Sequence, residues 1–536
     1  MSKKPDLLTA FILLASLVLL NVYCLNININ TDSSFSLRYV LSLSDQAPDL
    51  LVVQPGNRLF PEWAYSFLIA QVTQDPLLWS RLMIAINTLL LAGTTCYFAS
   101  TLGLKQRDAI NATAMLLLIT PATALLHHHY HIYFIHSPGI HGHYVPYILL
   151  AFALSLQLLN RATATTNPWH GLFYVLVLAA CAGSNIAFVL AVVPSLMSVI
   201  LWQSWKQETN LKKVSVWALL TFTGLALSWL WVALVAHLDA FSLKSLGSTW
   251  FNQSFIDWLS LDNRYLHQVA DREISGYAAE IMVASLVSSV VVLVLHLRKA
   301  SSNSLTVVNL LYMSWVPVFL LAMWAVDKEN IRHTPFLLLA APAMLIINVL
   351  SWWPNSWSRN LYWTTIAVFL CATSATLIYF DDSKPYIQNH RVMDLLKQLK
   401  NEGQINHHGL SDYWVANMAG TSPFTMAPIM PNGRPHGFAN DLLDVWQWQD
   451  QQPSHKNMTF IVNKCSLSNQ CALRVNAIKR HYGPWDQRFE LVDNNKIFYV
   501  YVYSQGIDLK VFYQQMERLV KYHKPVIHQS LFNPGS

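Results

Sequence analysis

The first 380 residues alternate long apolar segments with short polar connections. A helix needs about 20 apolar residues, with a range of about 17–25, to cross the hydrocarbon core of a bilayer. By this criterion the sequence predicts a mainly α fold, a polytopic bundle of about eleven transmembrane helices. The predicted spans are 7–24, 78–101, 108–126, 142–160, 169–184, 185–205, 214–237, 275–297, 305–325, 334–353 and 358–380.

The fifth and sixth segments form one apolar stretch, 169–205, that is interrupted at Gly183-Ser184-Asn185. A tight turn at this point makes two spans, whereas a single kinked helix would leave one span fewer. One span fewer would place Lys206, Lys212 and Lys213 outside the cell. Cytoplasmic loops are normally the ones enriched in Lys and Arg, and we therefore expect two spans.

Composition supports a membrane protein. Charged residues make up 12% of the chain, against about 25% in soluble globular proteins. The 20 Trp and 22 Tyr are residue types that prefer the interfaces of a bilayer. The net charge is only +6 and Lys and Arg form no long run, so the chain lacks the basic footprint of a nucleic-acid-binding protein.

The distribution of Lys and Arg predicts an orientation. The short connections on the side of Lys3 and Lys4 carry more of these residues than the longer loops opposite, which places the N-terminus in the cytoplasm. No small-x-small cleavage site follows the first apolar segment, so it is expected to remain as a span. We thus expect a multi-pass protein of a bacterial inner membrane, with outer loops 25–77, 127–141, 238–274 and 326–333 and a periplasmic C-terminal region.

The C-terminal region differs in character, which divides the chain into a membrane domain, 1–380, and a soluble domain, 381–536. Helical spacing predicts a helix over 389–399, and alternating or β-branched runs predict strands at 459–462 and 496–503. A last helix is expected over 509–522. These elements indicate a small α/β domain. Cys465 and Cys471 lie close together in it and would form a disulfide in an oxidising compartment, or remain two free thiols.

The first outer loop contains the candidate catalytic carboxylates. Asp32, Asp45 and Glu62 would act as a general base or hold a divalent metal against a phosphate, or would only solvate the loop. Glu62 stands out because a short apolar segment follows it, which suits a helix lying at the membrane interface. Arg58 lies four residues earlier and is a candidate phosphate-binding cation.

Histidines concentrate in the second outer loop, where seven of the 20 lie between His127 and His143. They suit phosphate binding, acid–base chemistry or metal binding at the outer face, or hydrogen bonds to lipid headgroups. His141 and His143 open the next predicted span. Arg332 lies at the mouth of a later span, where a guanidinium would bind a phosphate or extend to the interface.

Together, Phe60-Pro61-Glu62, His141-Gly142-His143 and Arg332, set in this layout of loops and spans, resemble the GT-C superfamily of membrane glycosyltransferases. These enzymes take sugars from polyprenyl-phosphate donors and have outward-facing active sites. The resemblance implies a transferase that moves a hexosyl or pentosyl group to a cell-envelope acceptor. Its partners would be the lipid-linked donor, membrane lipid and that acceptor.

The resemblance also implies roles for these residues. Asp32, Asp45 or Glu62 would take the proton of the acceptor hydroxyl, and inversion of configuration would follow from a single displacement. Positive charge at the leaving phosphate would come from Arg58, His141, His143 and Arg332, or from a divalent metal such as Mg²⁺ or Mn²⁺. Members of the superfamily usually place a pair of adjacent carboxylates in the first loop, whereas this chain has separated ones.

Three alternatives are compatible with the same sequence. A transporter or flippase of lipid-linked intermediates would need ionisable groups near mid-membrane or inverted repeats, and the sequence shows neither clearly. A non-enzymatic scaffold would use the outer domain to bind a partner. An O-antigen-ligase-like enzyme would also use a sugar-lipid donor, with its chemistry on outer His and Arg residues.

Overall fold

The computed structural model describes helices in the first part of the chain and a mixed α/β region in the C-terminal part. The described residues are 7–25, 64–73, 75–123, 144–160, 168–184, 186–206, 210–239, 278–297, 304–325, 335–351, 363–368, 370–372, 374, 390–412, 415–416, 424–434, 458–467, 470–493, 496–507 and 512.

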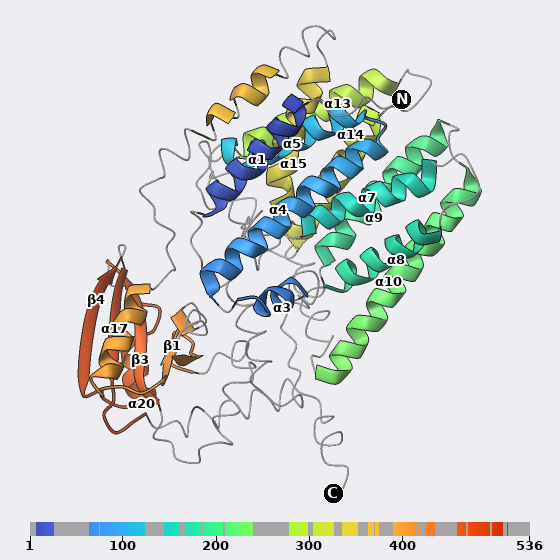
Figure 1. Ribbon diagram of the computed structural model, residues 1–536. Coiled ribbons are helices and arrows are strands. Elements are labelled where there is room, and N and C mark those ends of the chain that lie inside the picture. Colours follow the sequence, from blue (N-terminus) through green and yellow to red (C-terminus); the bar gives the residue numbers. More distant parts are fainter. Residues whose placement is uncertain are drawn as a thin grey trace, which may run out of the picture.

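The helical part consists of long helices lying side by side, with the short helix α3 at the end of α4 (Figure 1). Its elements are α1 (Leu7–Leu25), α3 (Ala64–Ala70), α4 (Pro76–Thr101), α5 (Gln106–Thr123), α7 (Val145–Asn160), α8 (Pro168–Ser184), α9 (Ile186–Trp205), α10 (Leu211–Asp239), α13 (Ala278–Leu297), α14 (Ser304–Ala325) and α15 (Pro335–Ser351). The break at Ser184 thus separates two helices, α8 and α9.

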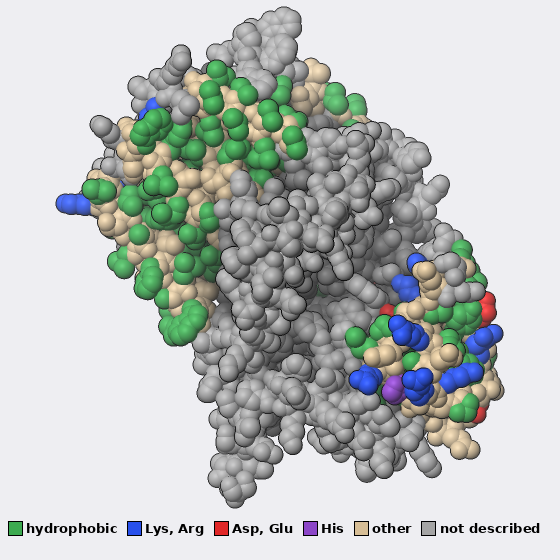
Figure 2. Space-filling model, turned by 180° about the vertical axis from the view of Figure 1, so that it is seen from behind, with side chains coloured by type: hydrophobic (Ala, Val, Ile, Leu, Met, Phe, Trp, Pro, Cys, Tyr) green, Lys and Arg blue, Asp and Glu red, His purple; other side chains and the backbone are tan. Residues whose placement is uncertain are grey.

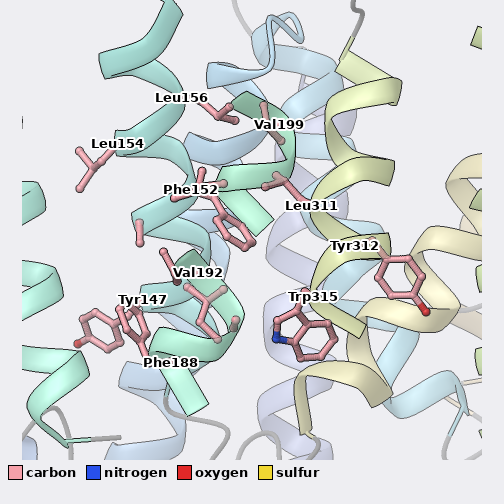
Figure 3. Packing of buried hydrophobic residues seen from close by; sticks show 14 of the residues in the cluster. Tyr147, Phe152, Leu154, Leu156, Phe188, Val192, Val199, Leu311, Tyr312 and Trp315 are labelled. Carbon is pink, nitrogen blue, oxygen red and sulfur yellow. The ribbon is translucent and has the colours of Figure 1, made fainter. Parts of the chain in front are cut away.

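The main core of the helical part lies between α7, α8, α9, α10 and α14. Phe152 of α7, Phe188 and Val192 of α9, and Trp315 of α14 gather in it (Figure 3). Close contact between α8 and α10 requires Gly224, because a Cβ at this position would lie 2.7 Å from the Cβ of Leu178. A smaller cluster joins α1, α4, α5 and α7.

The expected bundle of about eleven spans is wrong. Among the described residues, two helical segments are long and apolar enough to cross a membrane, Leu78–Thr101 of α4 and Leu211–Leu230 of α10. Shorter apolar stretches of 10–17 residues occur in several other described helices, as in Val145–Leu159 and Val283–His296. The physical reason is that a helix buried among other helices is as apolar as one that faces lipid. A count of apolar segments therefore overestimates the number of spans.

Helix α10 exposes a broad apolar surface. Leu219, Phe222 and Trp229 are each more than 60% exposed, and Figure 2 shows hydrophobic side chains covering the helical part on the face seen from behind. A contiguous exposed apolar surface marks a site of contact with membrane or protein. Together with the two long apolar helices, it supports association with a membrane.

The C-terminal part contains a five-stranded mixed sheet with the order β2-β1-β3-β5-β4. Its strands are β1 (His408–Ser411), β2 (Thr425–Pro428), β3 (Met458–Ser466), β4 (Gln487–Asp493) and β5 (Lys496–Val502). Strand β1 lies between β2 and β3 and is parallel to both. Strand β5 is antiparallel to β3 and β4. The expected strands at 459–462 and 496–503 correspond to β3 and β5.

Each face of the sheet has its own core. Val392, Leu396 and Leu399 of α17 (His390–Asn401) cover one face, and Ile478 and Tyr482 of α20 (Val475–Tyr482) cover the other. Strand β1 crosses close to Phe460, and a Cβ at position 409 would lie 2.4 Å from its ring, so Gly409 is required there. The helix expected over 509–522 lies outside the described residues except for Phe512.

Candidate functional site at the corner of helices α3 and α4

The proposed catalytic and phosphate-binding side chains all lie outside the described residues. They are Asp32, Asp45, Arg58, Glu62, His141, His143 and Arg332. The structure therefore neither brings them together nor separates them. It does describe the chain directly after Glu62, where the short apolar segment forms α3, beginning at Ala64. This helix was expected on the basis of its length and composition, and it leads to the candidate site.

A tight corner connects α3 to α4. The amides of Val72 and Thr73 donate to the carbonyl of Ile69 at 2.8 and 2.9 Å and end α3. The carboxylate of Asp75 then accepts a hydrogen bond from the amide of Leu78 at 3.3 Å, as an N-capping residue does. These hydrogen bonds define where α3 ends and where α4 begins.

The seam between the two helices is apolar and closely packed. Ile69 of α3 lies against Trp79 and Met83 of α4, and Tyr65 and Ile86 extend the cluster at its margins. Trp79 is completely buried. In an apolar seam of this kind, each buried polar atom needs a hydrogen-bond partner.

Two polar side chains in this seam have no partner among the described residues. The hydroxyl of Ser66 and the indole N–H of Trp79 are buried, and neither makes a hydrogen bond there. Both side chains are 0% exposed. Leaving a buried donor unpaired costs about 1–3 kcal/mol. The described part of the chain does not offset this cost, which a ligand oxygen accepting a hydrogen bond from either group would offset.

Arg81 adds a positive charge one half-turn further along α4. It lies about 8 Å from the start of the helix, and its Nε is also buried without a partner among the described residues. No carboxylate within the described ranges forms a salt bridge with it. Residues two apart point to different faces of a helix, so the charge of Arg81 acts at a distance from Trp79. A half-buried guanidinium favours an anionic ligand near this corner.

Tyr65 connects the corner to the main core. Its ring packs against both the seam cluster and the core between α7 and α14. Burial, and to a smaller extent the nearby Cys181, raises the pKa of Tyr65. The hydroxyl therefore stays protonated at physiological pH and remains a hydrogen-bond donor.

The corner thus offers donors and a cation to a ligand that brings oxygen atoms and negative charge. A phosphate group at the interface of a membrane has both properties. Sequence reasoning missed Ser66, Trp79 and Arg81. The available signal was Arg81, a single cation within the predicted span 78–101, because a charge inside an apolar helix is functional by default.

The polar groups between α13, α14 and α15 have partners and a structural role. Asn309 of α14 and Asn348 of α15 hydrogen-bond to each other, and Asn348 also donates to Ser288 and Ser289 of α13 at 3.0 and 3.2 Å. Polar contacts of this kind hold apolar helices in register. Because all of these groups make hydrogen bonds, they offer no comparable site for a ligand.

In the C-terminal part, a disulfide joins Cys465 to Cys471 at the end of β3. It closes a short loop in which the amide of Ser466 donates to the carbonyl of Gln470 at 2.9 Å. Within the described residues, no group of three or more His, Cys, Asp or Glu side chains is placed to hold a metal ion.

Comparison with known proteins adds no relative. No family model matches the chain, and no curated protein matches it at a significant level.

Proposed function

We propose that the protein is a membrane glycosyltransferase that moves a sugar from a polyprenyl-phosphate donor to a cell-envelope acceptor. The observation that supports this proposal best is the pair of buried donors at the corner of α3 and α4, Ser66 and Trp79, which have no partner among the described residues. In the sequence, Ser66 follows four residues and Trp79 seventeen residues after Glu62, the first-loop carboxylate with the most suggestive position. A phosphate binder next to a carboxylate is what glycosyl transfer from a lipid phosphate requires.

In the proposed reaction the acceptor hydroxyl attacks the anomeric carbon of the sugar. The bond from that carbon to the phosphate oxygen breaks, and the lipid phosphate leaves with the bonding electrons. A first-loop carboxylate, Asp32, Asp45 or Glu62, takes the proton of the hydroxyl. Ser66 and Trp79 donate hydrogen bonds to the phosphate oxygens. Arg81, which points to another face of α4, contributes only longer-range positive charge.

We further propose that the protein is a multi-pass protein of a bacterial inner membrane, with the N-terminus in the cytoplasm and the C-terminal domain in the periplasm. Two observations support this topology. Lys206 lies over the rings of Trp202 and Trp205 at the end of α9, 5.7 and 4.7 Å from their centroids. This is the combination of cation and aromatic residues found at cytoplasmic interfaces. The Cys465–Cys471 disulfide suits an oxidising compartment.

A binding experiment tests the role of the corner. The full-length chain in detergent is titrated with undecaprenyl phosphate, and the affinity is compared between wild type, Trp79→Phe and Ser66→Ala. We expect each variant to bind about 10- to 150-fold more weakly, the equivalent of one lost hydrogen bond to a charged group. Trp205→Phe and Ser100→Ala are matched controls, because both residues are exposed on the same group of helices.

A cellular experiment tests the reaction. Each variant is expressed in a deletion strain, and the surface glycans are compared with those of the strain complemented by the wild-type gene. We expect Trp79→Phe and Glu62→Gln to leave the glycan defect in place at normal protein levels. If both variants restore the wild-type glycans, the transferase proposal is wrong. If the wild-type protein binds undecaprenyl phosphate but every variant restores the wild-type glycans, the protein has another role with lipid-linked molecules.

A further inference from the structure

A turn after β2 lies along helix α20 and brings their cations together. The amide of Arg474 donates to the carbonyl of Pro431 at 3.0 Å, and the hydroxyl of Tyr482 donates to the carbonyl of Gly433 at 2.6 Å. Gly433 has a φ of 81°, and a Cβ at this position would lie 2.9 Å from the ring of His481. The close approach of the turn therefore depends on glycine.

The resulting surface is strongly positive. We call it the α20 basic face and define it by five residues: Arg434, Arg474, Lys479, Arg480 and His481. Neither the turn 430–434 nor α20 contains an Asp or a Glu. Helix α17 covers the opposite face of the sheet in Figure 1, and the view from behind in Figure 2 shows Lys and Arg side chains gathered on the sheet domain.

The pKa of His481 is affected by this positive charge. Burial lowers the pKa of His481, and the charges of Arg434 and Arg480 lower it further. Cations from the turn and from the helix thus act on one point of the surface. An anionic partner at this face would reverse the second effect.

Helix stability explains only part of this surface. Lys479, Arg480 and His481 lie in the last turn of α20, where cations are favourable. Arg474, in contrast, occupies the N-cap position without a capping hydrogen bond from its side chain. A cation is electrostatically unfavourable at the N-terminus of a helix, and arginine is not a preferred N-cap residue. The charge of Arg474 therefore points to a partner outside the domain.

Exposed apolar side chains flank the basic residues. Met430 belongs to the same turn as Arg434, and Leu467 lies in the disulfide loop that leads into α20; they are 39% and 56% exposed. Basic residues beside exposed apolar tips are typical of surfaces that lie on the interface of an anionic membrane. A soluble anionic ligand would not need the apolar tips.

From these contacts we infer that the α20 basic face lies on anionic phospholipid headgroups of the membrane in which the helices are embedded. The inference rests on the membrane embedding proposed above but not on glycosyl transfer. Residues 375–389 connect the apolar helical segment that ends near Ser374 to α17, and such a tether reaches at most about 50 Å. A tether of this length keeps the domain at a high effective concentration near the bilayer. Each Lys or Arg near an anionic surface raises the affinity for it about fivefold, and with the tether this is enough for docking.

Hydrogen exchange in nanodiscs tests this inference. The full-length chain is reconstituted in discs of pure phosphatidylcholine and in discs with 30% phosphatidylglycerol, and exchange is followed in a peptide that covers α20. We expect exchange in this peptide to be at least threefold slower in the phosphatidylglycerol discs at low salt. High salt should remove the difference, because it screens exposed charges.

Two variants make the experiment specific. Arg434→Glu/Arg480→Glu should abolish the difference between the lipids, whereas Lys397→Glu/Lys400→Glu on α17 should retain it. Exchange in β3 serves as the measure of folding for all variants. The inference is wrong if wild type shows no dependence on lipid, if the double variant on α20 keeps it, or if inorganic phosphate alone gives the same protection, which would indicate a soluble ligand. If the chain does not enter nanodiscs, the embedding proposed above fails together with the inference; if it enters and shows no lipid dependence, only the inference fails.

Discussion

The side-chain amides of Asn309 and Asn348 hydrogen-bond to each other in both directions, each at 2.9 Å, between α14 and α15. Both residues are completely buried. Asn348 also reaches the hydroxyls of Ser288 and Ser289, so one side chain connects three helices. This arrangement satisfies donors and acceptors that would otherwise be costly in an apolar core.

We therefore predict that Asn348→Leu destabilises the helical part by about 1–3 kcal/mol, because it leaves the side-chain oxygen of Asn309 without the donor it has in Asn348. Thermal unfolding in detergent measures the effect. Asn309→Leu/Asn348→Leu provides the control, since removing both partners costs less than removing one. A double variant less stable than either single variant would contradict this account.

The corner of α3 and α4 should show the opposite behaviour. Ser66→Ala removes a buried hydroxyl that has no partner among the described residues. We expect the ligand-free protein to be equally stable or more stable by up to about 1–3 kcal/mol, while binding of undecaprenyl phosphate weakens. Ser285→Ala is the matched contrast, because its hydroxyl bonds to Tyr312 and its loss should destabilise. A clear loss of stability in Ser66→Ala would show that the hydroxyl has a structural role.

Gly409→Ala should destabilise the sheet domain by about 1–3 kcal/mol through overpacking. The added Cβ would meet the ring of Phe460, which is itself held edge-on against Phe424 at a centroid distance of 6.0 Å. Hydrogen exchange in β1 and β3 measures the loss. Gly93→Ala is the control, since nothing lies within 4 Å of its Cβ position. Equal exchange in wild type and Gly409→Ala would mean that Phe460 moves aside at little cost.

The sheet domain should lose stability as the pH falls below 6.5. Burial lowers the pKa of His408, and the neighbouring His407 lowers it further; burial together with Arg434 and Arg480 does the same for His481. Below the ordinary value of 6.5, the unfolded chain binds these protons before the folded one does, and the free energy of unfolding decreases. Exchange of the β3 and β5 amides at pH 7.5 and 5.5 measures this change. His408→Gln/His481→Gln should flatten the dependence, and an unchanged slope in that variant would assign it to other groups.

By itself, the sequence determined where the helices and two of the strands lie. The apolar segments of helical length correspond to helices from α1 to α15, and the interruption of the apolar stretch at Gly183-Ser184-Asn185 lies between α8 and α9. The sequence runs predicted β3 and β5 but missed β1, β2 and β4; the first two have only four residues each, too few to show a period. Local sequence carries this information because helix and strand formation depend on neighbouring residues.

Only the tertiary structure decided which apolar helices are long enough to cross a membrane and which polar atoms lack a partner. The hydrophobicity of a segment is the same whether its side chains face lipid or another helix. The number of apolar segments therefore did not give the number of spans. Ser66 and Trp79 are ordinary residues in the sequence, and their significance arises because the packing of α3 on α4 removes both from water. Burial of this kind depends on contacts between elements, which no local pattern records.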